Sequence, residues 1–183
     1  MSYYGPKELA AAFRTVRNNT ITIAEEIPEE HYGYRVTPDS RSLAEALVHI
    51  AVGTRFPEQV HIVERRTTME GFDFMGFLSK LTAEEKAPRS KREIVDLLRS
   101  EGEKFAQALE GISEDALAER VGLAPGMVPS TKSRFEMLLG PKEHEMHHRA
   151  QLMVVERSLG ITPHLTRQMQ ERMAAMRAAQ AGK

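Results

Sequence analysis

Apolar residues recur at every third or fourth position along most of the chain, and this period restricts the fold more than any other feature. The first stripe steps by 4, 3, 4, 3 and 4 through Leu9, Phe13, Val16, Thr20, Ile23 and Ile27. Side chains at this spacing lie on one face of an α-helix, whereas strands require strict alternation. The sequence therefore predicts a long first helix, which ends at Pro28 because proline cannot continue it.

Three further long helices are predicted. The second opens at a capping box formed by Ser42 and Glu45, and it should be kinked or divided at Pro57. The third begins at Ser90 and carries its apolar stripe to position 112. The fourth spans about 131–159, with Gly140-Pro141 breaking its middle and Gly160 closing it.

Shorter segments complete the predicted order. Residues 67–80 suggest a loop or broken helix, Thr82–Glu85 another capping box, Ser113 the cap of a short helix, and 121–130 a loop. A last helix over about 163–179 carries Leu165, Met169, Met173 and Met176 in one stripe, which favours core or dimer packing. With no convincing strand, the prediction is an all-α four-helix bundle. We expect one domain over residues 1–183, with its core over about 7–160.

Composition excludes several functions. Among 183 residues the net charge is −1, which gives no electrostatic case for binding nucleic acid. No run of apolar residues is long enough for a membrane span, and the first residues lack the pattern of a signal peptide. There is no cysteine, so any metal site must use histidine and carboxylate ligands. A cytoplasmic protein with a small-molecule substrate is expected.

Histidines are concentrated in one short segment. Of the seven in the chain, three fall within His144-Glu145-Met146-His147-His148. On a helix, His144 and His148 lie one turn apart on the same face, so both imidazoles can reach one transition metal. The third ligand then decides what kind of protein this is.

The same five residues spell HExxH, the signature of zincin metalloproteases, in which Glu145 would be the general base. That interpretation needs a third ligand downstream, where Glu156 and Glu171 are the candidates. Neither belongs to an extended metzincin motif, and no strands are predicted to hold a substrate peptide. Glu145 also lies about 100° of helix rotation away from the His144/His148 face, which argues against its acting as a base.

A third ligand upstream is the alternative. His49 has apolar neighbours on its own helical face, so its ring nitrogens need a partner. A metal would supply one, and a backbone carbonyl in the core would supply another.

Two segments resemble the DinB/YfiT-like family of metal-dependent proteins. Ser42-Leu-Ala-Glu-Ala-Leu-Val-His49-Ile50 is similar to the family's second-helix motif, and His144-Glu-Met-His-His148-Arg149-Ala150-Gln151 is similar to its H-x-x-x-H-R-G-Q motif, with Ala150 in place of glycine. The resemblance implies a four-helix bundle in which His49, His144 and His148 bind a divalent metal. It also implies a homodimer, which many members form.

Three imidazoles leave at least one coordination position open, as in catalytic zinc sites. Zinc is the first expectation, with nickel or iron as alternatives. Related families, the bacillithiol S-transferases and mycothiol-dependent maleylpyruvate isomerases, imply a thiol-dependent transferase, with a hydrolase as the other chemistry. A non-catalytic bundle held together by metal is the competing interpretation.

Several residues are candidates for supporting roles. Glu45 and Gln151 are sequence-local acceptors for the second imidazole nitrogens. His147 lies one residue off the metal face and is expected on the helix surface, with a supporting role beside the metal ligands as the alternative. Arg55, Arg149 and Tyr34 are candidates for contact with an anionic ligand, or are packing and solvated residues.

Overall fold

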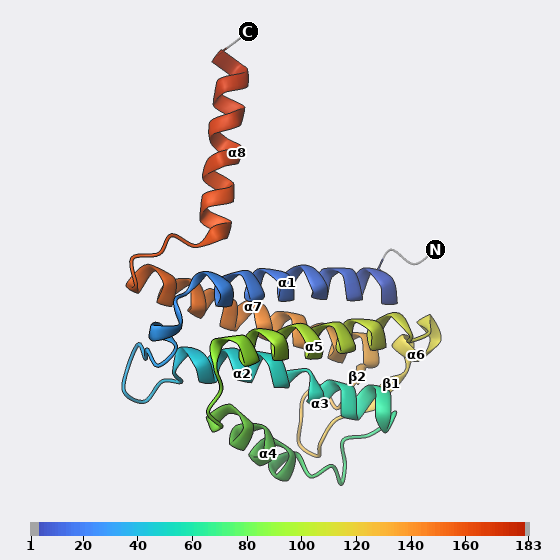
Figure 1. The fold of residues 1–183 in the computed structure, drawn as a ribbon. Helices are drawn as coiled ribbons and strands as arrows, with labels where there is room; N and C mark the ends of the chain where they lie inside the picture. The colour runs from blue at the N-terminus through green and yellow to red at the C-terminus, as the bar shows by residue number, and fades with distance from the viewer. Residues whose placement is uncertain (1–3, 182–183) are drawn as a thin grey trace.

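The computed structural model describes residues 4–181, and most of them are helical (Figure 1). Four helices form a bundle: α1 (Pro6–Glu26), α2 (Leu43–Gly53), α5 (Lys91–Glu110) and α7 (Arg134–Ser158). Helices α1 and α2 each pack against both α5 and α7. The predicted all-α four-helix bundle is therefore confirmed.

The remaining elements are two helices of 13 and 18 residues and several short segments. They are the 3₁₀ turn Glu29–His31, α3 (Arg55–Glu58), the π-helix Gln59–Val63, α4 (Phe74–Lys86), α6 (Glu114–Ala118), β1 (Arg120–Gly122), β2 (Thr131–Ser133) and α8 (His164–Ala181). Helix α4 packs against α2, and it therefore lies at the edge of the bundle that carries His49.

Local chemistry explains where the bundle helices start and which faces they bury. Helices α2, α5 and α7 each begin at a serine that accepts the N–H of a glutamate three residues on, while that glutamate binds the serine N–H in return. Such reciprocal bonds satisfy backbone donors that the first helical turn leaves free. The α1 stripe predicted from the sequence is buried: Leu9, Phe13, Val16, Thr20, Ile23 and Ile27.

Two short strands correct the prediction for residues 121–133. Strands β1 and β2 pair antiparallel, with Arg120 opposite Ser133 and Gly122 opposite Thr131. The predicted loop is therefore shorter than 121–130, because its first two residues belong to β1 and only the Gly- and Pro-rich remainder connects the two strands. Because β2 occupies residues 131–133, α7 begins at Arg134 and not at 131.

Two further expectations about helices were wrong, and one was confirmed. Thr82 does not cap a helix, because α4 starts earlier, where the Asp73 carboxylate accepts the N–H of Gly76 at 2.9 Å. The confirmed one is the division of the second helix by Pro57: α2 ends at Gly53, the break lies at Thr54, and Pro57 lies in the short α3 that follows. Gly140-Pro141 does not interrupt α7, which is continuous over 25 residues. Both residues line a cavity, so no neighbouring helix crowds α7 where the proline removes a backbone donor.

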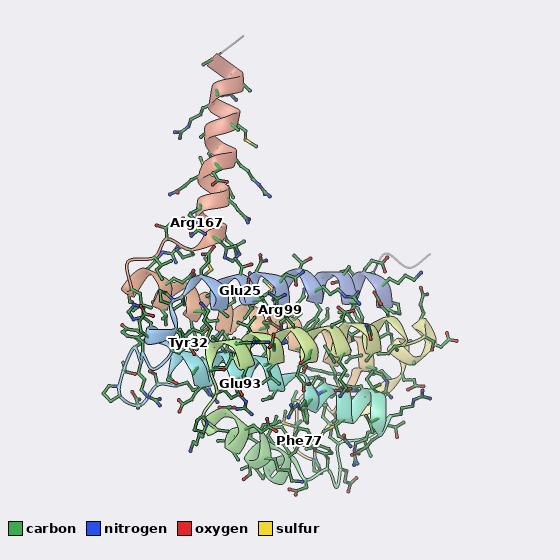
Figure 2. All side chains as sticks on the ribbon, in the orientation of Figure 1. Glu25, Tyr32, Phe77, Glu93, Arg99 and Arg167 are labelled. Atoms are coloured by element: carbon green, nitrogen blue, oxygen red, sulfur yellow. The ribbon has the colours of Figure 1, made fainter. Side chains whose placement is uncertain are left out.

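Helix α8 extends away from the bundle (Figure 1). Its side chains project outward along most of its length, beyond Arg167 at its base (Figure 2). Met169, Met173 and Met176 are exposed, so this stripe does not belong to the core of the single chain. Within residues 4–181, no helix combines the length and apolar character needed to cross a membrane.

Candidate metal centre

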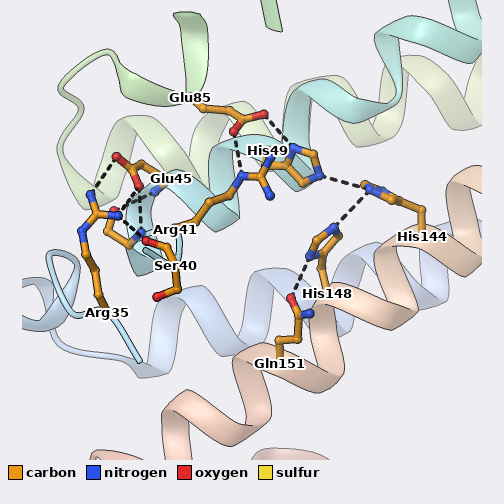
Figure 3. Close-up of polar contacts among 10 residues, drawn as sticks. Arg35, Ser40, Arg41, Glu45, His49, Glu85, His144, His148 and Gln151 are labelled. Carbon is orange, nitrogen blue, oxygen red and sulfur yellow. Dashed lines mark hydrogen bonds and ion pairs between the residues drawn. The ribbon is translucent and has the colours of Figure 1, made fainter. Parts of the chain in front are cut away.

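Three histidines from two helices converge at one point. Helix α2 supplies His49, and α7 supplies His144 and His148 one turn apart (Figure 3). The Nε2 atom of His144 lies 3.1 Å from Nε2 of His49 and 3.1 Å from Nε2 of His148. All three ligand nitrogens lie within 4.8 Å of one another. Sequence reasoning named these three residues, and the structure brings them together.

The spacing of these nitrogens matches what one metal ion requires. Nitrogen ligands lie about 2.0–2.1 Å from zinc, so two ligands at a tetrahedral angle are separated by roughly 3.4 Å. Burial, together with the nearby His148 and His49, lowers the pKa of His144 to about 4. Burial is also the main cause that lowers the pKa of His148. Both rings are therefore neutral at neutral pH and keep the lone pair that a metal needs.

The orientation of His49 is fixed by a carboxylate on α4. Its Nδ1 lies 2.7 Å from Oε1 of Glu85, and Oε2 of Glu85 accepts a bond from Arg41 Nε at 2.7 Å (Figure 3). An ionised carboxylate only accepts hydrogen bonds, so the proton of the neutral ring resides on Nδ1. Nε2 then presents its lone pair to His144 and His148. Carboxylates bonded in this way are typical partners of metal-binding histidines.

His148 is oriented from its own helix. Its Nδ1 lies 2.9 Å from Oε1 of Gln151, and Nε2 of Gln151 lies 3.1 Å from Nε2 of His147. The amide oxygen accepts the proton of His148 Nδ1, so Nε2 of His148 is left to face the cluster. Gln151 is thus confirmed as an imidazole partner. His147 is exposed, as predicted, and its ring is bonded to the same amide.

Glu45 was the wrong partner for His49. Its carboxylate forms an ion pair with Arg35 and closes the capping box of α2 (Figure 3). The correct residue, Glu85, lies 36 positions from His49 along the chain. Nothing in the local sequence of either helix indicates that they meet, so this contact needed the tertiary structure.

The glutamate of the HExxH pattern faces away from the cluster. Glu145 is 2% exposed and forms an ion pair with Arg17 of α1, which is 3% exposed. Arg17 also donates to the backbone oxygens of Leu98 and Ile50. Glu145 therefore joins helices in the core and is not placed to activate water at the histidines. Glu156, a candidate zincin ligand, is outside the cluster as well.

The three residues predicted to contact an anionic ligand lie in different surroundings. Tyr34 lines a cavity beside the histidines. Arg55 is instead held by Glu84 and Glu101, in ion pairs of 2.9 and 2.7 Å. Arg149 lines neither of the two cavities beside the cluster, as far as residues 4–181 show.

Cavities flank the histidines on two sides. One, of about 1180 Å³, is lined by both polar and apolar side chains and is formed by the segment 34–46 together with α4 and α7. His148, His147 and Gln151 line it, as do Glu85 and Lys86. The other, of about 340 Å³, is mainly apolar and is lined by His49, His144 and side chains of α3, α4 and α7. A small molecule therefore has room to approach the cluster.

Comparisons with known proteins agree with this architecture. An uncharacterised protein of Bacillus subtilis, YjoA, is 26% identical over 155 residues, which are 85% of this chain and 91% of YjoA. The crystal structure of YjoA superposes with a TM-score of 0.63, covering 85% of this chain and 94% of that one at 24% identity. A DinB-like protein of Bacillus cereus superposes at 0.62 and 20% identity, covering 85% and 93%.

The same fold occurs in an enzyme. A mutant of a mycothiol-dependent maleylpyruvate isomerase superposes with a TM-score of 0.60 at 14% identity, covering 81% of this chain and 61% of that chain. At such low identity the likeness shows the fold alone. The family itself is shown by a sequence model, described as DinB superfamily, which matches residues 12–152. The chain therefore belongs to the DinB superfamily.

Proposed function

We propose that this protein is a metal-dependent enzyme acting on a small molecule, with His49, His144 and His148 as metal ligands. The observation that carries the proposal is the convergence of three Nε2 atoms, two of whose rings are held through Nδ1 by Glu85 and Gln151. Rings oriented in this way present their lone pairs inward before any ion arrives. That arrangement favours a metal over other partners for these histidines.

Three neutral imidazoles leave a coordination position for a further ligand. When bound, a divalent metal at such a position acts as a Lewis acid and lowers the pKa of a bound water or thiol. The protein's own residues hold the ligands still: Glu85 keeps the proton on Nδ1 of His49, and Gln151 keeps it on Nδ1 of His148. Zinc is the metal we expect first, with nickel or iron as alternatives.

Thiol-dependent group transfer is the chemistry we favour, with hydrolysis as the alternative. Its support is the mycothiol-dependent isomerase of the same fold. The larger cavity beside His148 adds to this support, since a hydrophilic thiol cofactor needs a large site with polar groups, and charged and hydroxyl side chains line part of this one. Arg35 and Arg41 on its wall are each paired with a glutamate, and Lys86 would interact favourably with acidic or hydroxylated groups.

A purely structural metal site is the second candidate. Structural zinc sites are closed by four protein ligands. Among residues 4–181, the only group of possible metal ligands has three members, His49, His144 and His148, and no fourth protein ligand joins them. Cavities border this group on two sides. The open arrangement therefore favours an enzyme.

Metal content tests the proposal directly. Untagged protein, purified without added metal, should contain about one equivalent of a divalent transition metal by elemental analysis. His49→Ala should lose it, because two ligands from one helix bind far more weakly than three. His31→Ala is the matched control, since His31 lies in the 3₁₀ turn outside the cluster, and it should retain the metal.

Two results would contradict the proposal. Metal retained by His49→Ala would move the site to another ligand set and revive the zincin hypothesis. No metal in the wild type, even after reconstitution with zinc, nickel or iron, would make the three histidines ordinary polar residues of the bundle.

A further inference from the structure

The apolar cavity beside His49 and His144 has an unusual wall. None of its lining residues within the described chain is lysine, arginine, aspartate or glutamate. Its aromatic side centres on Phe56, whose ring packs edge-on against Phe74 and Phe77 at centroid distances of 5.4 and 6.0 Å. Leu81 and Met137 extend the apolar surface. A charged group entering this space would lose its hydration with no compensating partner.

One polar residue interrupts this wall away from the metal ligands. His61 lines the cavity, is only 4% exposed and lies in the middle of the π-helix Gln59–Val63. The wide turn is closed by the bond from Glu64 N–H to Gln59 O at 2.9 Å. Single π-turns within helical segments are uncommon and occur frequently at functional sites.

The ring of His61 has a defined tautomer. Nη1 of Arg134 lies 3.1 Å from its Nδ1, and Arg134 is itself 2% exposed and bonded to Glu119 and the Arg66 carbonyl. A guanidinium only donates, so Nδ1 must accept and the proton of the neutral ring lies on Nε2. Burial and the Arg134 charge lower the pKa of His61 to about 4, which keeps the ring neutral.

Nε2–H of His61 is therefore a fixed donor with no bonding partner among residues 4–181. Arg134 borders the neighbouring cavity, which residues 108–119 help to line, so we infer that the Nδ1 edge turns to that side and Nε2 to the aromatic cavity. A donor that faces a mainly apolar cavity has few partners, and an acceptor on a bound molecule would satisfy it.

We propose that the aromatic cavity is a substrate subsite for an uncharged, ring-sized apolar group that carries a hydrogen-bond acceptor, and that His61 recognises this acceptor through Nε2–H. The proposal rests on the proposed function, because the reaction would take place at the adjoining histidine cluster. His144, Pro141, Gly140 and Met137 line the cavity along α7. At 1.5 Å per residue this wall is about 10 Å long, so the bound group lies between the cluster and His61.

Three probes of similar size and shape separate the features of this subsite. Acetophenone carries a neutral acceptor on an aromatic ring, α-methylstyrene replaces the oxygen by a methylene group, and benzoate carries a negative charge. Titrations of the full-length protein, followed by NMR of its methionine methyl groups, should show acetophenone binding more tightly than α-methylstyrene. One hydrogen bond contributes about 0.5–1.5 kcal/mol, which corresponds to roughly 2- to 12-fold in affinity. Benzoate should bind most weakly.

Two variants locate the binding. His61→Phe keeps a ring of similar shape but lacks the donor, so acetophenone should bind no more tightly than α-methylstyrene. Gly140→Leu should block both probes, because Gly140 lines the cavity, a Cβ there meets no atom within 4 Å, and leucine favours helix. Ala150→Leu, on an exposed position of the same helix, is the matched control and should leave both affinities unchanged.

Several outcomes would overturn the proposal. These are no saturable binding of acetophenone up to its solubility, binding that Gly140→Leu leaves intact, or a preference for benzoate. A preference for acetophenone that survives in His61→Phe would remove His61 from recognition. Repeating the titration after metal removal with EDTA separates the two proposals, since the preference should persist there even if the metal proposal fails.

Discussion

The middle of α7 and its last turn each bury a glutamate, and the two carboxylates have opposite surroundings. Glu145 is 2% exposed, and both of its oxygens lie within 3.0 Å of Arg17 Nε. Glu156 is 0% exposed, and neither of its oxygens has a partner among residues 4–181. Burial raises the pKa of Glu156 to about 7, and nearby Glu26 adds to the shift, while Arg167 and Arg157 oppose it.

This difference shows how little a motif says about a buried charge. The HExxH pattern draws attention to Glu145, yet Arg17 neutralises it within the core. No motif draws attention to the environment of Glu156, yet that residue carries the larger electrostatic penalty. Partner geometry, and not residue type or burial, decides whether a glutamate stabilises this bundle.

The largest expected effect is at Glu145. Glu145→Ala should lower the free energy of unfolding by about 3–5 kcal/mol, because it leaves Arg17 buried without its counter-ion. Urea denaturation followed by circular dichroism measures this loss. Glu143→Ala, an exposed position two residues away, should change stability by less than about 0.5 kcal/mol.

The double variant Arg17→Met with Glu145→Leu sharpens the same test. Replacing both charges by apolar groups should recover most of the stability, since buried ion pairs are often matched by apolar packing. Equal losses in the single and double variants would mean that packing volume, and not the unpaired charge, is the cause.

The next effect is at Glu156 and depends on pH. Its folded pKa of about 7 lies above the ordinary value of 4.5, so its stabilising protonated form is complete below about pH 4.5 and is lost as the pH rises through 7. Glu156→Gln mimics the protonated form. Its advantage over the wild type should grow from near zero at acid pH to about 1–3 kcal/mol above pH 7. A constant difference across that range would refute the raised pKa.

A third carboxylate, Glu85, extends the comparison to the metal centre. Glu85→Ala should weaken metal binding about 10- to 100-fold in a chelator competition titration, because it removes the acceptor that orients His49. Glu45→Ala is the matched control, since its carboxylate pairs with Arg35 and not with a ligand. Equal affinities in the two variants would show that Glu85 does not support the site.

The smallest expected effect is at α8. A chain ending at Arg167 keeps the ion pair with Glu26 and removes mainly exposed residues, so its stability should change by no more than about 0.5 kcal/mol. Light scattering on both chains tests the predicted homodimer. If the exposed methionines form its interface, the shortened chain should become monomeric, and the stability of the full chain should depend on its concentration.

The sequence predicted what depends on neighbouring residues. Helix stripes, the serine caps of α2, α5 and α7, and the His144/His148 pair all follow from spacings of three or four residues. His49 was predicted as the third metal ligand from its apolar surroundings and from the family resemblance. The two strands were missed because each has only three residues.

Contacts between distant segments could not be predicted in the same way. Glu85 meets His49 across 36 residues, and Arg134 meets His61 across 73. Arg17 meets Glu145 across 128. Each partner is an ordinary charged residue in its own helix, so only the packing of the helices reveals its role.

Helix α4 has a consequence for how ligands affect one another. It gives Glu85 to His49, Phe77 and Leu81 to the apolar cavity, and Thr82 and Lys86 to the larger cavity. A molecule that holds α4 against α2 therefore favours the arrangement in which His49 is oriented. By thermodynamic linkage, a metal ion and a cavity ligand that both favour this arrangement raise each other's affinity by the same factor. Titrating acetophenone with and without bound zinc would measure that cooperativity.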